Sequence, residues 1–260
     1  MTESGARKAA RRILETMQRQ YSAPNTIVSV SEAQFAHLDL ATYGTFRAEM
    51  EAEQFRHIGD LEILEVSQSP TTLLARAMIR SMISEDGIIV SGYYQVKPRI
   101  WRYMRLLAKG LLNLRLVDAS RVFVRGMHTR HCNGFETEFD DGTFLVTSNA
   151  QAASVISGPP TIESNYFPYG TPPSVLLQAH RTRVEETLGA KTQVKPVVVA
   201  TLADLLQMLK RQGTQKAAYR ATAQWITKAE LQGMTEGRPE IADAVFSEVQ
   251  KLLNNGQSGA

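Results

Sequence analysis

Cysteine is almost absent from this chain, and long hydrophobic runs are missing altogether. Cys132 is the single cysteine among 260 residues, so an intrachain disulfide is excluded and we expect a reducing compartment, the cytoplasm. No run approaches the roughly 18 apolar residues of a transmembrane helix. The cations Arg7, Lys8, Arg11 and Arg12 are not followed by the apolar segment of a secretory signal, whereas an Arg-rich organellar presequence stays open.

Specific catalytic motifs are also missing. The sequence contains no Walker A loop, no G-x-G-x-x-G, no G-x-S-x-G, no H-E-x-x-H and no C-x-x-C. It has no internal repeat either. These absences leave the enzyme question open, favour a protein that is not an enzyme, and predict no cofactor.

Positive charge is concentrated in one segment and nearly balanced elsewhere. Residues 97–130 hold nine of the 29 Lys and Arg residues and a single acid, Asp118. Concentrated charge usually indicates a partner. Within this segment the apolar spacing of Ile100–Leu114 predicts an amphipathic helix with cations on its polar side. The residues that we predict to bind the partner are Arg99, Trp101, Arg102, Arg105 and Lys109.

An acidic protein is the partner that we expect for this basic segment. A nucleic-acid backbone or an anionic membrane would suit the same charges. A solvated surface helix without any partner is the simplest alternative. The leading hypothesis is therefore a non-catalytic cytosolic binding or adaptor protein, and the sequence leaves its oligomeric state open.

His128, His131 and Cys132 form the densest cluster of metal-capable side chains. Neutral histidine and thiolate are good zinc ligands, but a closed site needs a fourth ligand that the motif does not supply. Cys132 could instead be a nucleophile with one of the histidines as its base. The neighbouring glycines and asparagine favour a polar loop, so we leave the catalytic and metal interpretations open.

Carboxylates recur at every second position just after this cluster. Glu136, Glu138 and Asp140 would share one side of a strand, and Asp60 with Glu62 could lie on a nearby strand. Such an arrangement can hold Mg²⁺ in a phosphate hydrolase. Alternating acids on the solvated face of a strand are the simpler interpretation.

Two Asp-Gly pairs between alternating apolar runs predict β-hairpins, at Asp86-Gly87 and at Asp141-Gly142. A two-residue turn at the second would place Phe139 opposite Phe144 and Thr137 opposite Val146. The strand pairing would then have one apolar face and one wetter face.

Helices are predicted around this sheet. Ser31 with Gln34 matches a capping box that opens a helical stretch, and a strand begins at Asp60. The predicted helices cover 4–20, 175–188, a segment from Thr201 to Gly213, 216–231 including Trp225, and 240–253. Residues 157–173, rich in proline, are expected to form an ordered loop.

The order of these elements predicts an α+β fold. We expect an antiparallel sheet of about five or six strands flanked by helices and followed by a helical C-terminal region. The expected divisions are a basic N-terminal helix (1–30), an α+β domain (31–190), a helical region (191–253) and a disordered tail (254–260).

One stretch of sequence also resembles other proteins. The segment from Thr137 to Asn149, with residues 55–60 before it and Pro159, Pro160, His180 and Arg183 after it, is similar to a broad group of uncharacterised bacterial proteins with this order of segments. The resemblance covers residues 45–185. It implies one structural unit across that span and no activity.

Overall fold

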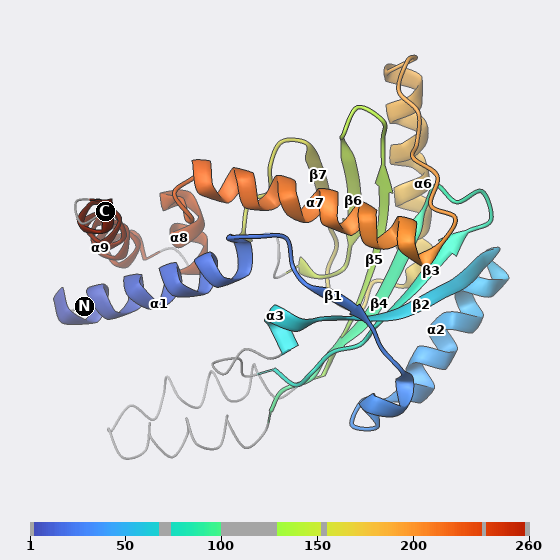
Figure 1. The fold of residues 1–260 in the computed structure, drawn as a ribbon, viewed down its shortest axis with the longest axis horizontal. Coiled ribbons are helices and arrows are strands. Elements are labelled where there is room, and N and C mark those ends of the chain that lie inside the picture. Colours follow the sequence, from blue (N-terminus) through green and yellow to red (C-terminus); the bar gives the residue numbers. More distant parts are fainter. Residues whose placement is uncertain (1–2, 68–73, 100–128, 152–154, 236–237, 258–260) are drawn as a thin grey trace. The chain divides into compact units, whose positions relative to one another are not determined.

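The computed structural model describes residues 3–67, 74–99, 129–151, 155–235 and 238–257 (Figure 1). The helix predicted at Ile100–Leu114 lies outside these ranges, as does most of the basic segment. The predicted site residues outside them are Trp101, Arg102, Arg105, Lys109 and His128. The roles assigned to those five residues stay predictions.

The chain divides into two compact units that are not consecutive in sequence. A sheet unit comprises residues 26–151 and 162–208, and a helical unit comprises residues 1–25, 152–161 and 209–260. Each contains its own cluster of buried apolar side chains. Helix α7 (Leu202–Thr222) begins in the sheet unit and continues in the helical unit.

In the described residues, the sheet unit is built on seven strands that lie side by side in chain order. They are β1 (Ile27–Ser29), β2 (Phe55–Ile63), β3 (Ile79–Ser84), β4 (Val90–Val96), β5 (Arg130–Glu138), β6 (Phe144–Ser148) and β7 (Ile162–Tyr166). Neighbours are antiparallel except β6 and β7, which are parallel. The predicted α+β class is confirmed, with one or two strands more than expected. One of the added strands, β7, lies in the proline-rich segment predicted to be a loop.

Both predicted hairpins are present, and the glycine of each Asp-Gly pair has a positive φ, 75° at Gly87 and 81° at Gly142. The register of the second is one residue away from the prediction, because Glu138 lies opposite Phe144. Its loop is longer than two residues: the Phe139 amide donates to the Thr143 carbonyl at 2.8 Å. Because side chains alternate along a strand, this shift moves the β6 side chains to the other face.

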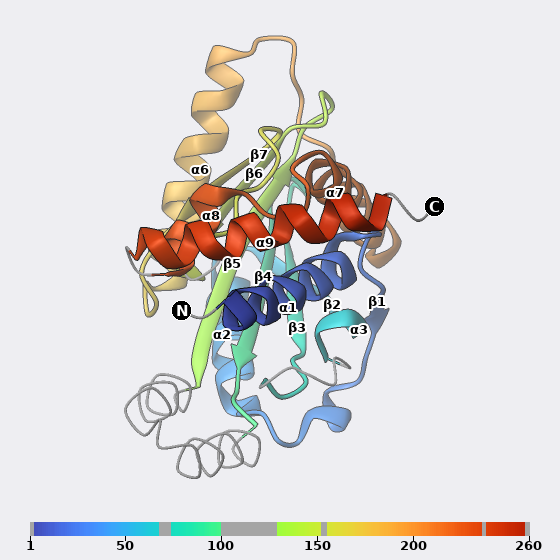
Figure 2. The ribbon, with the colours of Figure 1, turned by 90° about the vertical axis from the view of Figure 1, so that its left-hand side faces the viewer.

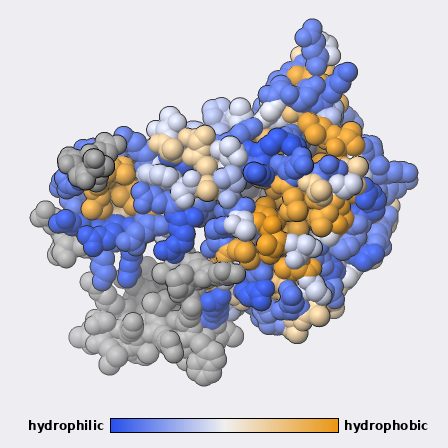
Figure 3. Space-filling view, in the orientation of Figure 1, coloured by the Kyte–Doolittle hydropathy of each residue, from blue (hydrophilic) through white to orange (hydrophobic). Residues whose placement is uncertain are grey.

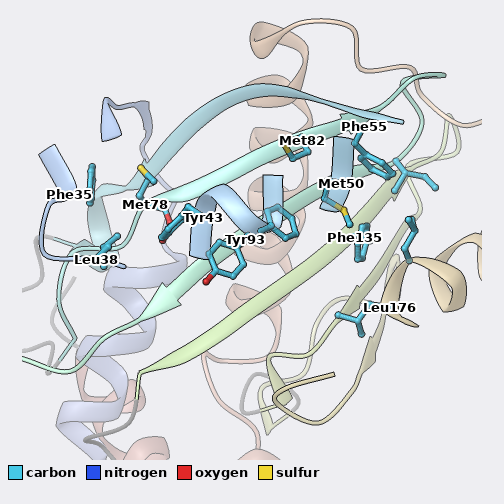
Figure 4. Close-up of a cluster of buried hydrophobic side chains, with 13 residues drawn as sticks. Phe35, Leu38, Tyr43, Met50, Phe55, Met78, Met82, Tyr93, Phe135 and Leu176 are labelled. Carbon is cyan, nitrogen blue, oxygen red and sulfur yellow. The ribbon is translucent and has the colours of Figure 1, made fainter. Parts of the chain in front are cut away.

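One face of the sheet is covered by two helices, α2 (Leu40–Ala52) over β2 to β4 and α6 (Pro173–Ala190) over β5 and β6. Between them and the strands lies an apolar core (Figure 4). Its fully buried members include Tyr43 and Met50 of α2, Met82 and Phe135 of the sheet, and Leu176 of α6. Met82 and Phe135 share a face because each is in register with Ser91 of β4. Burial of this core is the main stabilising contribution to the sheet unit.

The described part of the sheet unit also contains two short helices. The first, η1 (Glu32–Phe35), is a single 3-10 turn, and Ser31 makes no capping hydrogen bond through its side chain. The second, α3 (Leu64–Ser67), follows β2 directly. The capping box predicted at Ser31 is therefore wrong, and the long helix starts later, at Leu40. Strand β2 likewise begins at Phe55, before the predicted Asp60.

The helical unit contains α1 (Glu3–Tyr21), the second part of α7, α8 (Lys228–Met234) and α9 (Pro239–Gln257). Helices α1 and α9 lie side by side (Figure 2). Ala10 and Leu14 of α1 are buried with Val245 and Val249 of α9. These apolar residues recur every three to four positions, so the amphipathic pattern of each helix accounts for their pairing.

The predicted helix boundaries around residues 213–231 are wrong. Helix α7 continues through Gly213 to Thr222, and Trp225 lies in the turn after it with φ of 73°. A Cβ atom on Gly213 would lie 3.2 Å from Cβ of Pro24, so this glycine permits a close approach inside the helix instead of ending it. Within the described residues, no helix is long and apolar enough to cross a membrane.

Candidate functional site

The described ends of the basic segment contact the chain itself. Lys97 Nζ donates to the His37 carbonyl, and Arg99 Nη2 donates to the Ser67 carbonyl at 3.2 Å. The Arg130 guanidinium lies 4.8 Å from the centre of the Tyr169 ring. Arg99 is half-buried, and its guanidinium is hydrogen-bonded to the backbone of Ser67. The other four predicted partner-binding residues lie outside the described structure.

His131 and Cys132 do not come together as a catalytic pair. They are neighbours on strand β5, not in the predicted loop, so their side chains point to opposite faces of the sheet. His131 is exposed, and its Nδ1 lies 2.6 Å from the Tyr93 hydroxyl. Cys132 is buried, and burial raises the pKa of its thiol to about 11. A thiol with so high a pKa is a poor nucleophile at neutral pH.

We therefore expect Cys132 to resist thiol reagents in the folded protein. Treatment with 5,5′-dithiobis(2-nitrobenzoate) at pH 8 should release little thiolate colour until denaturant is added, and then one equivalent per chain. The reason is that the thiol is both enclosed and protonated. Stoichiometric labelling of the native protein within seconds would contradict the burial of this side chain.

Tyr93, against which His131 rests, belongs to a hydrogen-bonded network that fixes the start of α2. The Tyr93 hydroxyl lies 3.0 Å from Thr42 Oγ1. The Gln95 side chain pairs with the backbone of Asp39, accepting from its amide at 3.0 Å and donating to its carbonyl at 2.8 Å. Through these hydrogen bonds, His131, Tyr93 and Gln95 attach the start of α2 to strands β4 and β5.

The carboxylates predicted as a possible magnesium site are separated by the sheet. Asp60 is in register with Arg80, Tyr93 and Asn133, which places it on the face covered by α2. Glu136 and Glu138 are three and five residues after Asn133 on β5. Because successive side chains of a strand point to opposite faces, both lie on the face opposite to that of Asn133. Within the described residues, no three His, Cys, Asp or Glu side chains are grouped as metal ligands.

Asp60 and Glu62 are each neutralised by an arginine. Both oxygens of the buried Asp60 carboxylate accept from Arg80, at 3.0 Å each, and Oδ1 also lies 3.2 Å from His57 Nε2. Burial opposes ionisation of Asp60, but the bonds from His57 and Arg80 outweigh it and lower the pKa. Glu62 is bound in the same two-pronged way by Arg76, at 2.6 and 2.7 Å. These pairs are structural.

His180, in helix α6, is fully buried and hydrogen-bonded on both sides. Its Nε2 lies 3.0 Å from Thr137 Oγ1 and its Nδ1 lies 3.0 Å from Thr147 Oγ1. Thr137 gives its own proton to the Ile88 carbonyl, so Nε2 is assigned as the donor of a neutral ring. Burial, reinforced by the Arg183 charge, lowers the pKa of His180 to about 3.

This neutral histidine predicts that the sheet unit loses stability in mild acid. Below pH 6.5 His180 is protonated in the unfolded chain, whereas in the folded chain it stays neutral until the pH approaches its lowered pKa of about 3. The free energy of unfolding therefore falls as the pH falls, by up to about 1.4 kcal/mol per pH unit. Urea titrations from pH 7 to 4 should show this decline, with a shallower slope in His180→Gln. Equal slopes for the two proteins would contradict it.

The exposed side of helix α1 carries an uncompensated group of cations. Arg7, Lys8, Arg11 and Arg12 are all exposed, whereas the buried apolar side chains of α1 are Ala6, Ala10, Leu14 and Met17. At 100° per residue the four cations fall on one side of the helix. Within the described residues, none of their side chains has a hydrogen bond or an ion pair. We call these four residues the basic face of α1. In Figure 3, hydrophilic residues line the visible side of that helix.

Helix stability does not account for this arrangement. Arg7 with Arg11, and Lys8 with Arg12, are like charges at spacing i, i+4, and each such pair destabilises a helix by roughly 0.2–0.5 kcal/mol. Glu15 lies at the spacing where it could offset this repulsion for Arg11 and Arg12, but within the described residues it forms no ion pair with either. The helix dipole favours cations at the C-terminal end of a helix, and these four lie in the N-terminal half. An anionic partner would turn the repulsion into attraction.

Comparisons of the chain with protein-family models, with curated proteins and with solved structures find no match. The basic face of α1 is therefore the candidate site on the strength of its geometry and charge. Sequence reasoning identified the basic helix but assigned the partner to residues 97–130. The signal for this second surface was present in the sequence, since the four cations recur at i, i+1, i+4 and i+5, opposite Ala6, Ala10 and Met17.

Proposed function

We propose that this chain is a non-catalytic cytosolic binding protein that docks an acidic partner protein through clustered cations. The supporting observation is the basic face of α1, four exposed cations without ion pairs among the described residues. The basic segment 97–130, with Arg102, Arg105 and Lys109, is proposed as a second contact of the same kind. The single, buried Cys132 supports the choice of a reducing compartment.

The expected affinity is modest. An exposed ion pair contributes roughly 0.2–1 kcal/mol, so four pairs supply at most about 4 kcal/mol. That corresponds to a dissociation constant of about 1 mM or weaker. Docking through α1 alone would therefore be weak and sensitive to salt.

A pair of charge-reversal variants tests this proposal. We expect Arg7→Glu with Arg11→Glu to weaken binding of fluorescent poly-L-glutamate at low salt by about fivefold or more, since two attractions become repulsions. The control is Arg47→Glu with Lys210→Glu, two exposed cations elsewhere that give the same change in net charge. Both variants should fold, because exposed charges contribute little to stability.

Equal losses in the two variants would contradict the proposal for α1, because binding would then follow net charge alone. A third variant, Arg102→Glu with Arg105→Glu and Lys109→Glu, measures the contribution of the second segment. Fluorescence anisotropy at three salt concentrations gives all of the required dissociation constants.

A further inference from the structure

Glu15 breaks the charge pattern on the exposed side of α1. It lies four residues after Arg11 and three after Arg12, so it falls on the same side of the helix, one turn farther along. It is exposed, and within the described residues its side chain forms no hydrogen bond or ion pair. From Arg7 to Glu15 the helix rises about 12 Å. Over that length the exposed side changes from positive to negative, and the next exposed cation on that side, Arg19, lies one turn beyond Glu15.

This change of sign discriminates between anionic partners. A nucleic-acid backbone is negative along its whole length, so Glu15 would be repelled wherever the four cations are attracted. An anionic membrane repels Glu15 in the same way, and the apolar side of α1 that could enter a membrane is buried against α9. A protein segment can instead present carboxylates to the four cations and a basic side chain to Glu15.

We propose that the partner of the basic face is a protein segment in which carboxylates are followed, about one helical turn along its surface, by a lysine or arginine. Glu15 selects this partner and fixes its direction along α1. Opposite charges placed in register attract, whereas a partner docked in reverse would set its basic residue against the cations and its carboxylates against Glu15. The inference rests on the proposed docking function of the same face.

Two helical peptides test this selection. The first carries glutamates at i and i+4 with a lysine one turn later, and the second has a glutamate in place of that lysine. We expect the protein to bind the first peptide more tightly than the second by about two- to fivefold, the value of one exposed ion pair. A 20-base-pair DNA duplex and phosphatidylserine vesicles, at the same salt concentration, should bind more weakly than the first peptide.

Two variants that each raise the net charge by one unit complete the experiment. Glu15→Gln should abolish the preference for the first peptide. Gln18→Lys, on the same side of α1 one turn farther along, should strengthen binding of both peptides and keep the preference. A wild-type protein that prefers the second peptide, the duplex or the vesicles would overturn the inference, as would a preference that persists in Glu15→Gln. If Arg7→Glu with Arg11→Glu leaves binding of the first peptide unchanged, the docking function itself is wrong, and the inference falls with it.

Discussion

Replacing Glu230 with leucine is expected to destabilise the helical unit by about 3–5 kcal/mol, the usual effect of removing one partner of a buried ion pair. Arg220 and Glu230 are both almost completely buried, and the shortest distance between their charged atoms is 2.7 Å. Burial opposes ionisation of Glu230, but the Arg220 guanidinium and the amides of Thr227 and Ser157 outweigh it and lower the pKa. Without the carboxylate, the Arg220 charge would be left in the core.

The double variant Arg220→Met with Glu230→Leu separates charge burial from loss of packing. Removing both charges should restore part of the stability that Glu230→Leu loses, because no unpaired ion is left inside, while the amides of Ser157 and Thr227 still lose their acceptor. Thermal unfolding by circular dichroism measures both proteins. If the single and the double variants were equally unstable, the interaction of the charges would not be the reason for the effect.

Gly87→Ala is expected to destabilise the sheet unit by about 2–4 kcal/mol, from two independent causes. The backbone of Gly87 has φ of 75°, where a side chain is strained by roughly 1 kcal/mol. An added Cβ would also lie 2.9 Å from the carbonyl oxygen of Val199 and 2.9 Å from Val198 Cγ1. That crowding costs about a further 1–3 kcal/mol. It would disturb the hydrogen bond from the Val199 amide to the Gly87 carbonyl, 2.8 Å long.

Gly170→Ala is the matched control for this variant. Gly170 has φ of 87°, and nothing lies within 4 Å of an added Cβ. It should therefore show the conformational strain alone, about 1 kcal/mol. Urea unfolding of both variants gives the difference. A Gly87→Ala variant no less stable than Gly170→Ala would contradict the close packing of residues 198–199 against the hairpin.

The hairpins and the fold class could be predicted from the sequence because their signals are local. An Asp-Gly pair between alternating apolar runs is the strongest short-range signal for a hairpin. The register could not be predicted, because nothing local shows whether Phe139 continues the strand or enters the turn. Nor could the role of Gly213, whose close neighbour Pro24 is distant in sequence. A glycine that ends a helix and one that lets another segment approach look the same in a sequence.

Some features of the candidate sites could likewise be predicted from the sequence, and others could not. The basic character of α1 and its apolar stripe could be predicted, since both follow from helical periodicity. The fate of His131 and Cys132 could not, because it depends on their lying in a strand, where neighbours face opposite sides. The pairing of Asp60 with Arg80, from two neighbouring strands, needed the register of β2 against β3. Proximity in sequence therefore wrongly suggested that His131 and Cys132 act together, and it gave no indication that Asp60 pairs with Arg80.

Chemical-shift mapping tests the central claim most directly. The ¹⁵N-labelled protein is titrated at low salt with the peptide in which glutamates are followed by a lysine. We expect the largest amide shifts in the described part of the chain to lie in α1, at residues 7–15, and to disappear in Arg7→Glu with Arg11→Glu. Saturating shifts confined to other described helices or to the sheet, unchanged in that variant, would contradict it.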